Sequence, residues 1–134
     1  MTLPAAPMSA LVRAPRILPA LAAAAMLAAA PGARAQDAGA GAVSFMQCAD
    51  CHSPGAINGV GPGLKGVVGR KAGTQPDFVY SDALRKFGLA WDDKTLDAFL
   101  ADPRTAVPGN AMAFPGVEDA KDRADLIAYL KSLK

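Results

Sequence analysis

A five-residue segment, CADCH at positions 48 to 52, constrains this chain more than any other feature. It contains both cysteines and the one histidine of a chain of 134 residues. A Cys-x-x-Cys-His run is the signature of covalent haem attachment, in which each cysteine sulfur bonds a vinyl group of the haem and the histidine binds the iron. The segment predicts one covalent haem c, attached through Cys48 and Cys51, with His52 as an iron ligand.

Two other interpretations of the cysteine pair are weaker. A thiol–disulfide centre is expected beside a β-α-β pattern, which this sequence lacks. A zinc site needs four ligands, and the chain has no second pair of cysteines or histidines to complete them. Haem attachment is therefore favoured by elimination as well as by the motif itself.

Residues 1–35 have the layout of a secretory signal peptide. Two arginines precede an apolar run at 17–30, and a triplet of Ala, Arg and Ala that ends at Ala35 follows. The run is shorter than the roughly 20 residues of a membrane-spanning helix, so a retained membrane anchor is the weaker interpretation. We predict cleavage after Ala35, a single folded domain at 36–134 and export to the periplasm, with no stable membrane insertion once the leader is removed.

Cleavage would change the charge of the protein. Three of the 14 basic residues lie in the predicted leader, so 11 basic residues face 12 acidic ones in 36–134. No basic stripe remains that would favour nucleic acid, whose binding depends on clustered positive charge. A domain of this size has a thin core, and a large buried cofactor would add to it.

The pattern of residues predicts an all-α domain with long loops. No alternating apolar run of strand length is found, and two segments rich in Gly and Pro cannot be regular helix. Long loops without secondary structure are usually functional, and both would be explained if they wrap a ligand. Helices are predicted at 38–50, 81–86, from the Asp92 cap to Pro103, and at 118–133, with the loops at 53–73 and 104–116.

A six-coordinate haem iron needs a second ligand, and a methionine thioether is common in electron carriers. Outside the predicted leader the chain has two methionines. Met46 lies two residues before Cys48 on the same predicted helix and is better suited to packing. Met112 lies in the later loop and can approach from the other side, so we predict His52 and Met112 as the iron ligands.

These residues resemble the class I cytochromes c, which include mitochondrial cytochrome c and its bacterial relatives. The resemblance implies three main helices and a short one, wrapped with long loops around a covalent haem. It is carried by several motifs in the family's order: CADCH at 48–52, GPGLKGVVGRKAG at 61–73, Tyr80-Ser81, Trp91, PGNAMAF at 108–114 and DRADLIAYLK at 122–131.

The resemblance also implies roles for residues around the haem. Pro62 matches the proline whose carbonyl accepts the ring N–H of His52. Arg70, Tyr80 and Trp91 match the residues that hydrogen-bond a buried haem propionate. Further matches are Phe114, beside the exposed haem edge, and Gly41, Phe45 and Tyr129, where the first and last helices pack together.

Three features depart from the family pattern. Phe99 replaces a tyrosine that donates to the ligand sulfur, and Asn110-Ala111 replaces the Thr-Lys before the methionine. The ring of lysines around the haem edge of mitochondrial members is sparse. Its typical basic positions hold Gln47, Ala111, Glu118 and Asp119, while Arg104 and Lys65 remain.

The resemblance implies a monomeric periplasmic carrier of single electrons, with no catalytic residues and no enzyme activity of its own. Its expected partners are a quinol-oxidising complex, a terminal oxidase or a periplasmic dehydrogenase, and the sequence does not choose among them. The rival interpretation is a haem protein with an open iron position, which binds a small ligand or acts like a peroxidase. A third, the haem subunit of a larger enzyme, leaves the chemistry unchanged.

Overall fold

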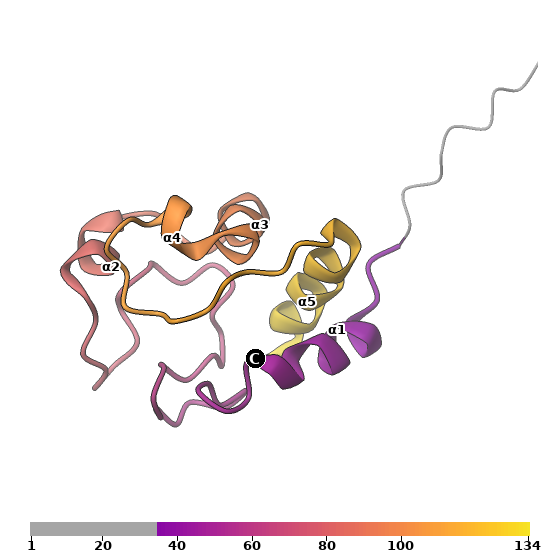
Figure 1. Ribbon diagram of the computed structural model, residues 1–134. Coiled ribbons are helices and arrows are strands. Elements are labelled where there is room, and N and C mark those ends of the chain that lie inside the picture. Colours follow the sequence, from indigo (N-terminus) through magenta and orange to yellow (C-terminus); the bar gives the residue numbers. More distant parts are fainter. Residues whose placement is uncertain (1–34) are drawn as a thin grey trace, which may run out of the picture. The chain divides into compact units, whose positions relative to one another are not determined.

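The computed structural model describes residues 35–134, so the predicted leader up to Arg34 lies outside the described residues. Within 35–134 the structure contains no strand, only an isolated bridge between Lys71 and Ala90. The all-α prediction is confirmed. In chain order the elements are α1 (Ala38–Ser44), the 3-10 helix η1 (Phe45–Gln47), α2 (Asp82–Phe87), α3 (Asp93–Ala101), α4 (Pro103–Ala106) and α5 (Ala120–Ser132) (Figure 1).

Helices α1 and α5, from opposite ends of the domain, pack side by side (Figure 1). Their backbones come close at Gly41, where an added Cβ would lie 2.9 Å from the Cβ of Tyr129 and would collide with the backbone carbonyl of Asp125. Next to this point the rings of Phe45 and Tyr129 pack with centroids 5.1 Å apart. A glycine is therefore needed at position 41 because a side chain would push the two helices apart.

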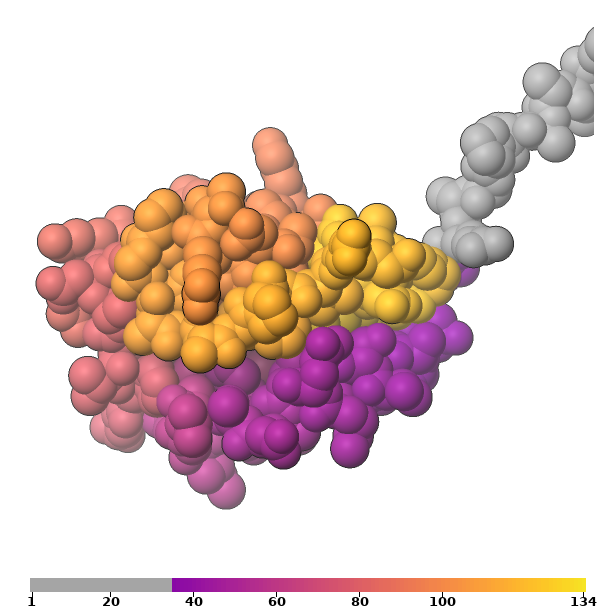
Figure 2. All heavy atoms as spheres, viewed as in Figure 1, coloured from indigo at the N-terminus to yellow at the C-terminus, as the bar shows by residue number. Residues whose placement is uncertain are grey.

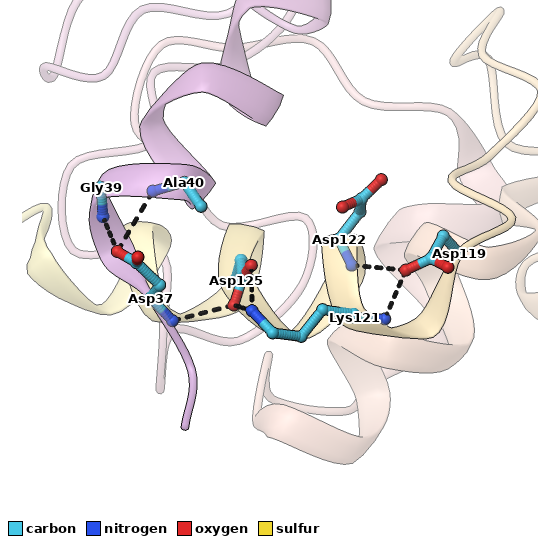
Figure 3. A network of polar contacts seen from close by, with 7 residues as sticks. All are labelled: Asp37, Gly39, Ala40, Asp119, Lys121, Asp122 and Asp125. Atoms are coloured by element: carbon cyan, nitrogen blue, oxygen red, sulfur yellow. Dashed lines mark hydrogen bonds and ion pairs between the residues drawn. The ribbon is translucent and has the colours of Figure 1, made fainter. Parts of the chain in front are cut away.

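A buried acid ties the same two helices together (Figure 3). Asp125, on α5, is only 3% exposed, and its Oδ1 accepts hydrogen bonds from the Asp37 backbone amide at 2.8 Å and from Lys121 Nζ at 2.6 Å. These bonds, that from Lys121 first, lower the pKa of Asp125 below its ordinary value. Asp37 in turn caps α1 with its side chain, and Asp119 caps α5 in the same way. The Asp125 carboxylate thus links the start of α1 to α5, while Asp37 and Asp119 each cap their own helix.

Two of the predicted helix boundaries are wrong. The first predicted helix, 38–50, ends as α-helix at Ser44, after which the chain tightens into η1 and a turn. The Cys48 amide bonds the carbonyl of Phe45 at 2.8 Å, three residues back rather than four. The last helix begins at Ala120 rather than Glu118, because Asp119 is its cap.

The helix capped by Asp92 ends before Pro103, as predicted, but Pro103 then begins a further helix that was not predicted. Helix α3 ends at Ala101, and Pro103 is the first residue of α4, where its missing N–H costs nothing. Asp102 caps α4 by accepting the Arg104 and Thr105 amides, each at 3.1 Å. The predicted loop at 104–116 therefore starts later, and the segment between α4 and α5, residues 107–119, is called here the Met112 loop.

Other predicted helix ends are confirmed. Ser81 caps α2 by accepting the Leu84 amide at 3.3 Å, and Gly88 ends that helix with a φ of 76°. Asp92 caps α3 by accepting the Thr95 amide at 2.7 Å. Within residues 35–134, no helix has the length and apolar character needed to cross a membrane.

The core lies where α3, α5 and η1 meet, and three aromatic side chains extend it toward α2. The Trp91 ring lies 4.9 Å from that of Phe99 and 5.7 Å from that of Phe87, centroid to centroid. Several core residues also form the wall of a cavity. Those shared by core and cavity are Phe45, Trp91, Leu96, Phe99, Leu100, Leu126 and Leu130.

Candidate functional site

A cavity of about 420 Å³ lies among the helices and the long loops. This volume falls within the range of roughly 300–1,000 Å³ that is typical of ligand sites. All four residues predicted to hold a cofactor line it: Cys48, Cys51, His52 and Met112. On the face shown in Figure 2, the orange atoms of the Met112 loop border the purple atoms of the first described residues. The cavity thus joins residues far apart in the sequence.

Both cysteines and the histidine are presented by the turn that follows η1. The His52 amide bonds the Cys48 carbonyl at 2.9 Å, and the Cys51 amide bonds the same oxygen at 3.1 Å. Cys48 is half-buried and Cys51 is exposed, and neither is in a disulfide. Burial raises the pKa of the Cys48 thiol, and the nearby Cys51 adds to the rise. One tight turn therefore brings two thiols and an imidazole to the same wall.

The orientation of the His52 ring is fixed by the loop that follows it. His52 Nδ1 lies 2.8 Å from the Pro62 carbonyl oxygen, in agreement with the role that the resemblance implies. A Cβ at Gly61 would lie 2.7 Å from Nδ1 and 2.8 Å from Nε2, so only glycine lets this backbone approach the ring. A hydrogen bond at Nδ1 sets the tautomer and leaves Nε2 as the nitrogen that can bind a metal.

Asn110 holds the Met112 loop in place. Its Nδ2 donates to the carbonyls of Pro103 at 2.6 Å and Val107 at 2.9 Å, and its Oδ1 accepts the Met112 amide at 2.9 Å. Asn110, which stands where the family has a threonine, therefore contacts the backbone of Met112. Two backbone atoms anchor the far end of the loop, where the Val117 amide bonds the Leu100 carbonyl at 2.8 Å.

The polar side chains expected to bind a haem propionate also line the cavity. Trp91 and Arg70 are joined through their backbones, the Trp91 amide bonding the Arg70 carbonyl at 2.9 Å. The guanidinium donates to the carbonyls of Gly63 and Lys65, each at 3.0 Å. Burial lowers the pKa of Arg70, and Tyr80 partly opposes this effect. A carboxylate brought into the cavity would find its cationic and polar partners here.

Two residues with side-chain amides, Gln75 and Asn58, lie near Arg70 and were not predicted from the sequence. The Gln75 side chain accepts a hydrogen bond from Arg70, while its backbone amide donates to the Tyr80 hydroxyl at 3.3 Å. The Asn58 side chain donates to the Pro76 carbonyl at 2.8 Å and accepts from the Gly63 amide at 2.9 Å. Both lie in loops rich in Gly and Pro, where a single polar residue gives no periodic signal. Only the fold reveals their partners.

The residues around the cavity fit a haem. Most of the wall is apolar, which suits the porphyrin face, while Arg70 is the one side chain of fixed positive charge among the lining residues of the described chain. Imidazole and thioether are suitable ligands for haem iron, and thiols for its vinyl groups. Phe99 is buried on this wall and offers no hydrogen-bond donor, in keeping with the predicted loss of that contact.

Comparison with known proteins agrees with this fit. The family model for cytochrome c matches residues 36–134. Cytochrome c2 of Rhodoplanes tepidamans is 50% identical over 97 residues, covering 71% of this chain and 91% of that protein. Cytochrome c2 iso-2 of Magnetospirillum fulvum is 54% identical over 91 residues, covering 67% of this chain and 95% of that protein.

A solved structure gives the same answer for the fold. Cytochrome cH from Methylobacterium extorquens superposes with a TM-score of 0.70 at 52% identity, covering 72% of this chain and 98% of that chain. A family match over the whole described domain and relatives at about half identity agree with the all-α fold around one cavity. The chain therefore belongs to the cytochrome c family, as a class I member that carries one covalent haem c and transfers electrons rather than acting as an enzyme.

Proposed function

We propose that this cytochrome carries single electrons in the periplasm, with its haem attached at Cys48 and Cys51 and its iron bound by His52 and Met112. The observation that best supports the proposal is that the CADCH turn and the Met112 loop, distant in sequence, line one cavity. When bound, the haem supplies a one-electron change between Fe(II) and Fe(III).

The chain's own residues would hold the two ligands firmly through this change. The Pro62 carbonyl orients the His52 ring and raises its basicity. Asn110 fixes the backbone of Met112 through an amide bond of 2.9 Å. A ligand set that stays in place needs little rearrangement when an electron arrives, which favours rapid transfer. It also leaves no iron position for a substrate.

Export and cleavage after Ala35 form part of the same proposal. Ala35 and Gln36 are both exposed in the structure, so the bond between them can be reached by a peptidase. The mass of the purified protein checks this point. A mass that corresponds to 36–134 plus one haem is expected, whereas a mass that includes the leader would mean that the domain stays tethered.

The docking surface for a quinol-oxidising complex, a terminal oxidase or a periplasmic dehydrogenase is proposed to be mainly apolar. Val60 and Val79 line the cavity and are 80% and 88% exposed. Ala111 and Ala113, on either side of Met112, are exposed as well. Docking that depends on charge steering is slowed strongly by salt. Because a mainly apolar surface depends little on charge steering, we expect the electron-transfer rate to vary weakly with ionic strength. A steep fall between low and physiological salt would contradict this surface.

The rival, an open-iron haem protein, is tested by ligand binding and the visible spectrum. The reduced wild type is expected to bind carbon monoxide slowly, and its oxidised form to show the weak band near the red end that reports a thioether ligand. Met112→Ala should bind carbon monoxide rapidly and lose the band. Met46→Ala is the matched control: the expectation that Met46 packs in the core is wrong, since its side chain is 69% exposed on η1, and its loss should leave both properties unchanged. Rapid binding by the wild type would favour the rival.

A further inference from the structure

Gln75 is the centre of a small polar network at one end of the cavity. Its Oε1 accepts a short hydrogen bond from Arg70 Nη1, and its Nε2 donates to the Ala56 carbonyl at 3.1 Å. Its backbone amide donates to the Tyr80 hydroxyl at 3.3 Å. Gln75 itself is half-buried and does not line the cavity, but Arg70 and Tyr80 both do. The residue therefore contacts two lining side chains from behind.

Arg70 marks where a carboxylate of the haem would lie. Haem carries two carboxylate groups, and a carboxylate taken out of water needs a cation or several donors to stay charged. Among the lining residues, all within the described chain, Arg70 is the one with a fixed positive charge. Tyr80 and Ser81 add hydroxyl groups to the lining of the same cavity. The polar end of the cavity is thus built for an anion.

The side-chain amide of Asn58 bonds backbone groups next to this network. Asn58 Nδ2 donates to the carbonyl of Pro76, the neighbour of Gln75, and Asn58 Oδ1 accepts the amide of Gly63. The Gly63 carbonyl accepts from Arg70 Nη2 at 3.0 Å. One nitrogen of the guanidinium is therefore held by the Gln75 side chain, and the other by a residue that Asn58 holds.

We propose that Gln75 is a positioning residue, whose side chain aims the Arg70 guanidinium at a haem carboxylate and so keeps that carboxylate ionised. The proposal depends on haem in this cavity but not on Met112 as the second ligand. A freely rotating arginine would spread its charge over several orientations, whereas a held one presents its donors in one direction. The Gln75 side chain acts through Arg70 and is not expected to touch the haem.

Other charged groups surround this end and remain unchanged in the test. Arg85, on α2, donates to the Tyr80 carbonyl at 2.6 Å and is paired with Asp82 of the same helix. His52 lies on the CADCH wall. Along the chain, the charged residues nearest to Arg70 and Gln75 are Lys65, Lys71 and Asp77.

The test measures the reduction potential of the haem-loaded protein as a function of pH. In the wild type the carboxylate should stay ionised, so the potential should be constant through neutral pH. Gln75→Met removes both side-chain bonds, so the pKa of the carboxylate should rise by about one unit. The fall of the potential with pH should then move to higher pH by the same amount.

Gln75→Glu provides a second variant of nearly the same size. It keeps an acceptor for Arg70 but adds a negative charge that competes with the haem carboxylate for the guanidinium. The inflection should move in the same direction as in Gln75→Met, and further. If Gln75→Met does not take up haem, this variant decides the outcome.

Gln47→Glu is the matched control. Gln47 is exposed and lines the cavity, and its side-chain amide donates to the Ser44 carbonyl at 3.0 Å. The same added charge here should change the potential without moving the inflection. An inflection that stays in place in Gln75→Glu, even with a loss of unfolding free energy, would overturn the proposal and make Gln75 merely structural. Absence of the thioether band from the spectrum of the oxidised wild type would overturn the assignment of Met112 as a ligand and leave this proposal standing.

Discussion

The α1–α5 contact and the loops around the cavity are stabilised in different ways. The helices meet backbone against backbone at Gly41, with the buried carboxylate of Asp125 tying them together. The loops are held by hydrogen bonds from the side-chain amides of Asn58, Gln75 and Asn110 to backbone carbonyls. The first region is held by direct contacts between two helices, whereas the second encloses a space that the cofactor fills.

The two regions are nevertheless not independent. Phe45, next to the Gly41 crossing, lines the cavity, and so do Leu126 and Leu130 on α5. The inner face of the helix pair is therefore also a wall of the haem site. The comparison suggests that helix packing determines where the cofactor lies, and that the cofactor in turn completes the core of the helix pair.

The largest expected effect comes from removing the haem. A Cys48→Ala/Cys51→Ala double variant should lose the cofactor and more than about half of its helical circular dichroism, because a helix of the length of α5 is marginal without packing. In the wild type, thiol titration should find no free cysteine. Persistent protection of α5 amides from hydrogen exchange in the double variant would show that the helix pair stands alone.

A methyl group at the helix crossing should have the next largest effect. Gly41→Ala is expected to lower the unfolding free energy by about 3 kcal/mol, because the new Cβ would meet backbone that cannot turn aside. The measurement is denaturant unfolding of the haem-loaded protein. Gly39→Ala is the control, since its Cβ would meet only the Asp37 side chain and the change should stay within about 1 kcal/mol. Equal losses in both would contradict the close approach.

The buried carboxylate should make stability depend on acid. The folded pKa of Asp125 is lowered by Lys121 and by the Asp37 amide, so its contribution is full above the ordinary value near 4 and is lost as pH falls toward the folded value. Asp125→Asn should be less stable at neutral pH and lose less stability on acidification below about pH 4. Asp122→Asn, exposed on the same helix, should keep the wild-type profile. Parallel profiles for all three proteins would remove Asp125 from the account.

The smallest effect tests backbone strain in the loops. Asp77 adopts a φ of 59°, which costs a residue with a side chain some energy. Asp77→Gly should therefore raise the unfolding free energy by about 0.5 kcal/mol. Gly66→Ala, at a φ of 66° with open space around it, should lower it by about 1 kcal/mol. Chemical denaturation of both variants measures these changes, and a loss in Asp77→Gly would mean that its side chain matters more than its backbone.

Much of the fold could be predicted because helix ends carry local signals. Ser81, Asp92 and Gly88 are residues whose chemistry caps or ends a helix wherever it occurs. Helix α4 was not predicted, because Pro103 is compatible both with the end of one helix and with the first position of another. Only the bonds of Asp102, which cap the second helix, decide between the two.

The residues of the candidate site also differ in whether the sequence could predict them. Cys48, Cys51 and His52 could be predicted from adjacent residues, and Met112 by elimination among few methionines. Gln75 and Asp125 could not, because their partners lie far away in the chain: Ala56 is 19 positions from Gln75, and Asp37 is 88 positions from Asp125. A polar residue within a helical pattern or a loop does not reveal a distant backbone partner.

The bond from the Asp37 amide to Asp125 makes the residue at which the mature chain begins matter for the contact between α1 and α5. A cut after Ala35 keeps that nitrogen as a neutral amide, with Gln36 as a spacer. A cut one residue later would make it an ammonium group, replacing a shared proton with a pair of opposite charges at the positive end of the α1 dipole. A chain that begins at Asp37 would therefore fasten the two ends of the domain through an ion pair, whereas one that begins at Gln36 would keep the amide hydrogen bond.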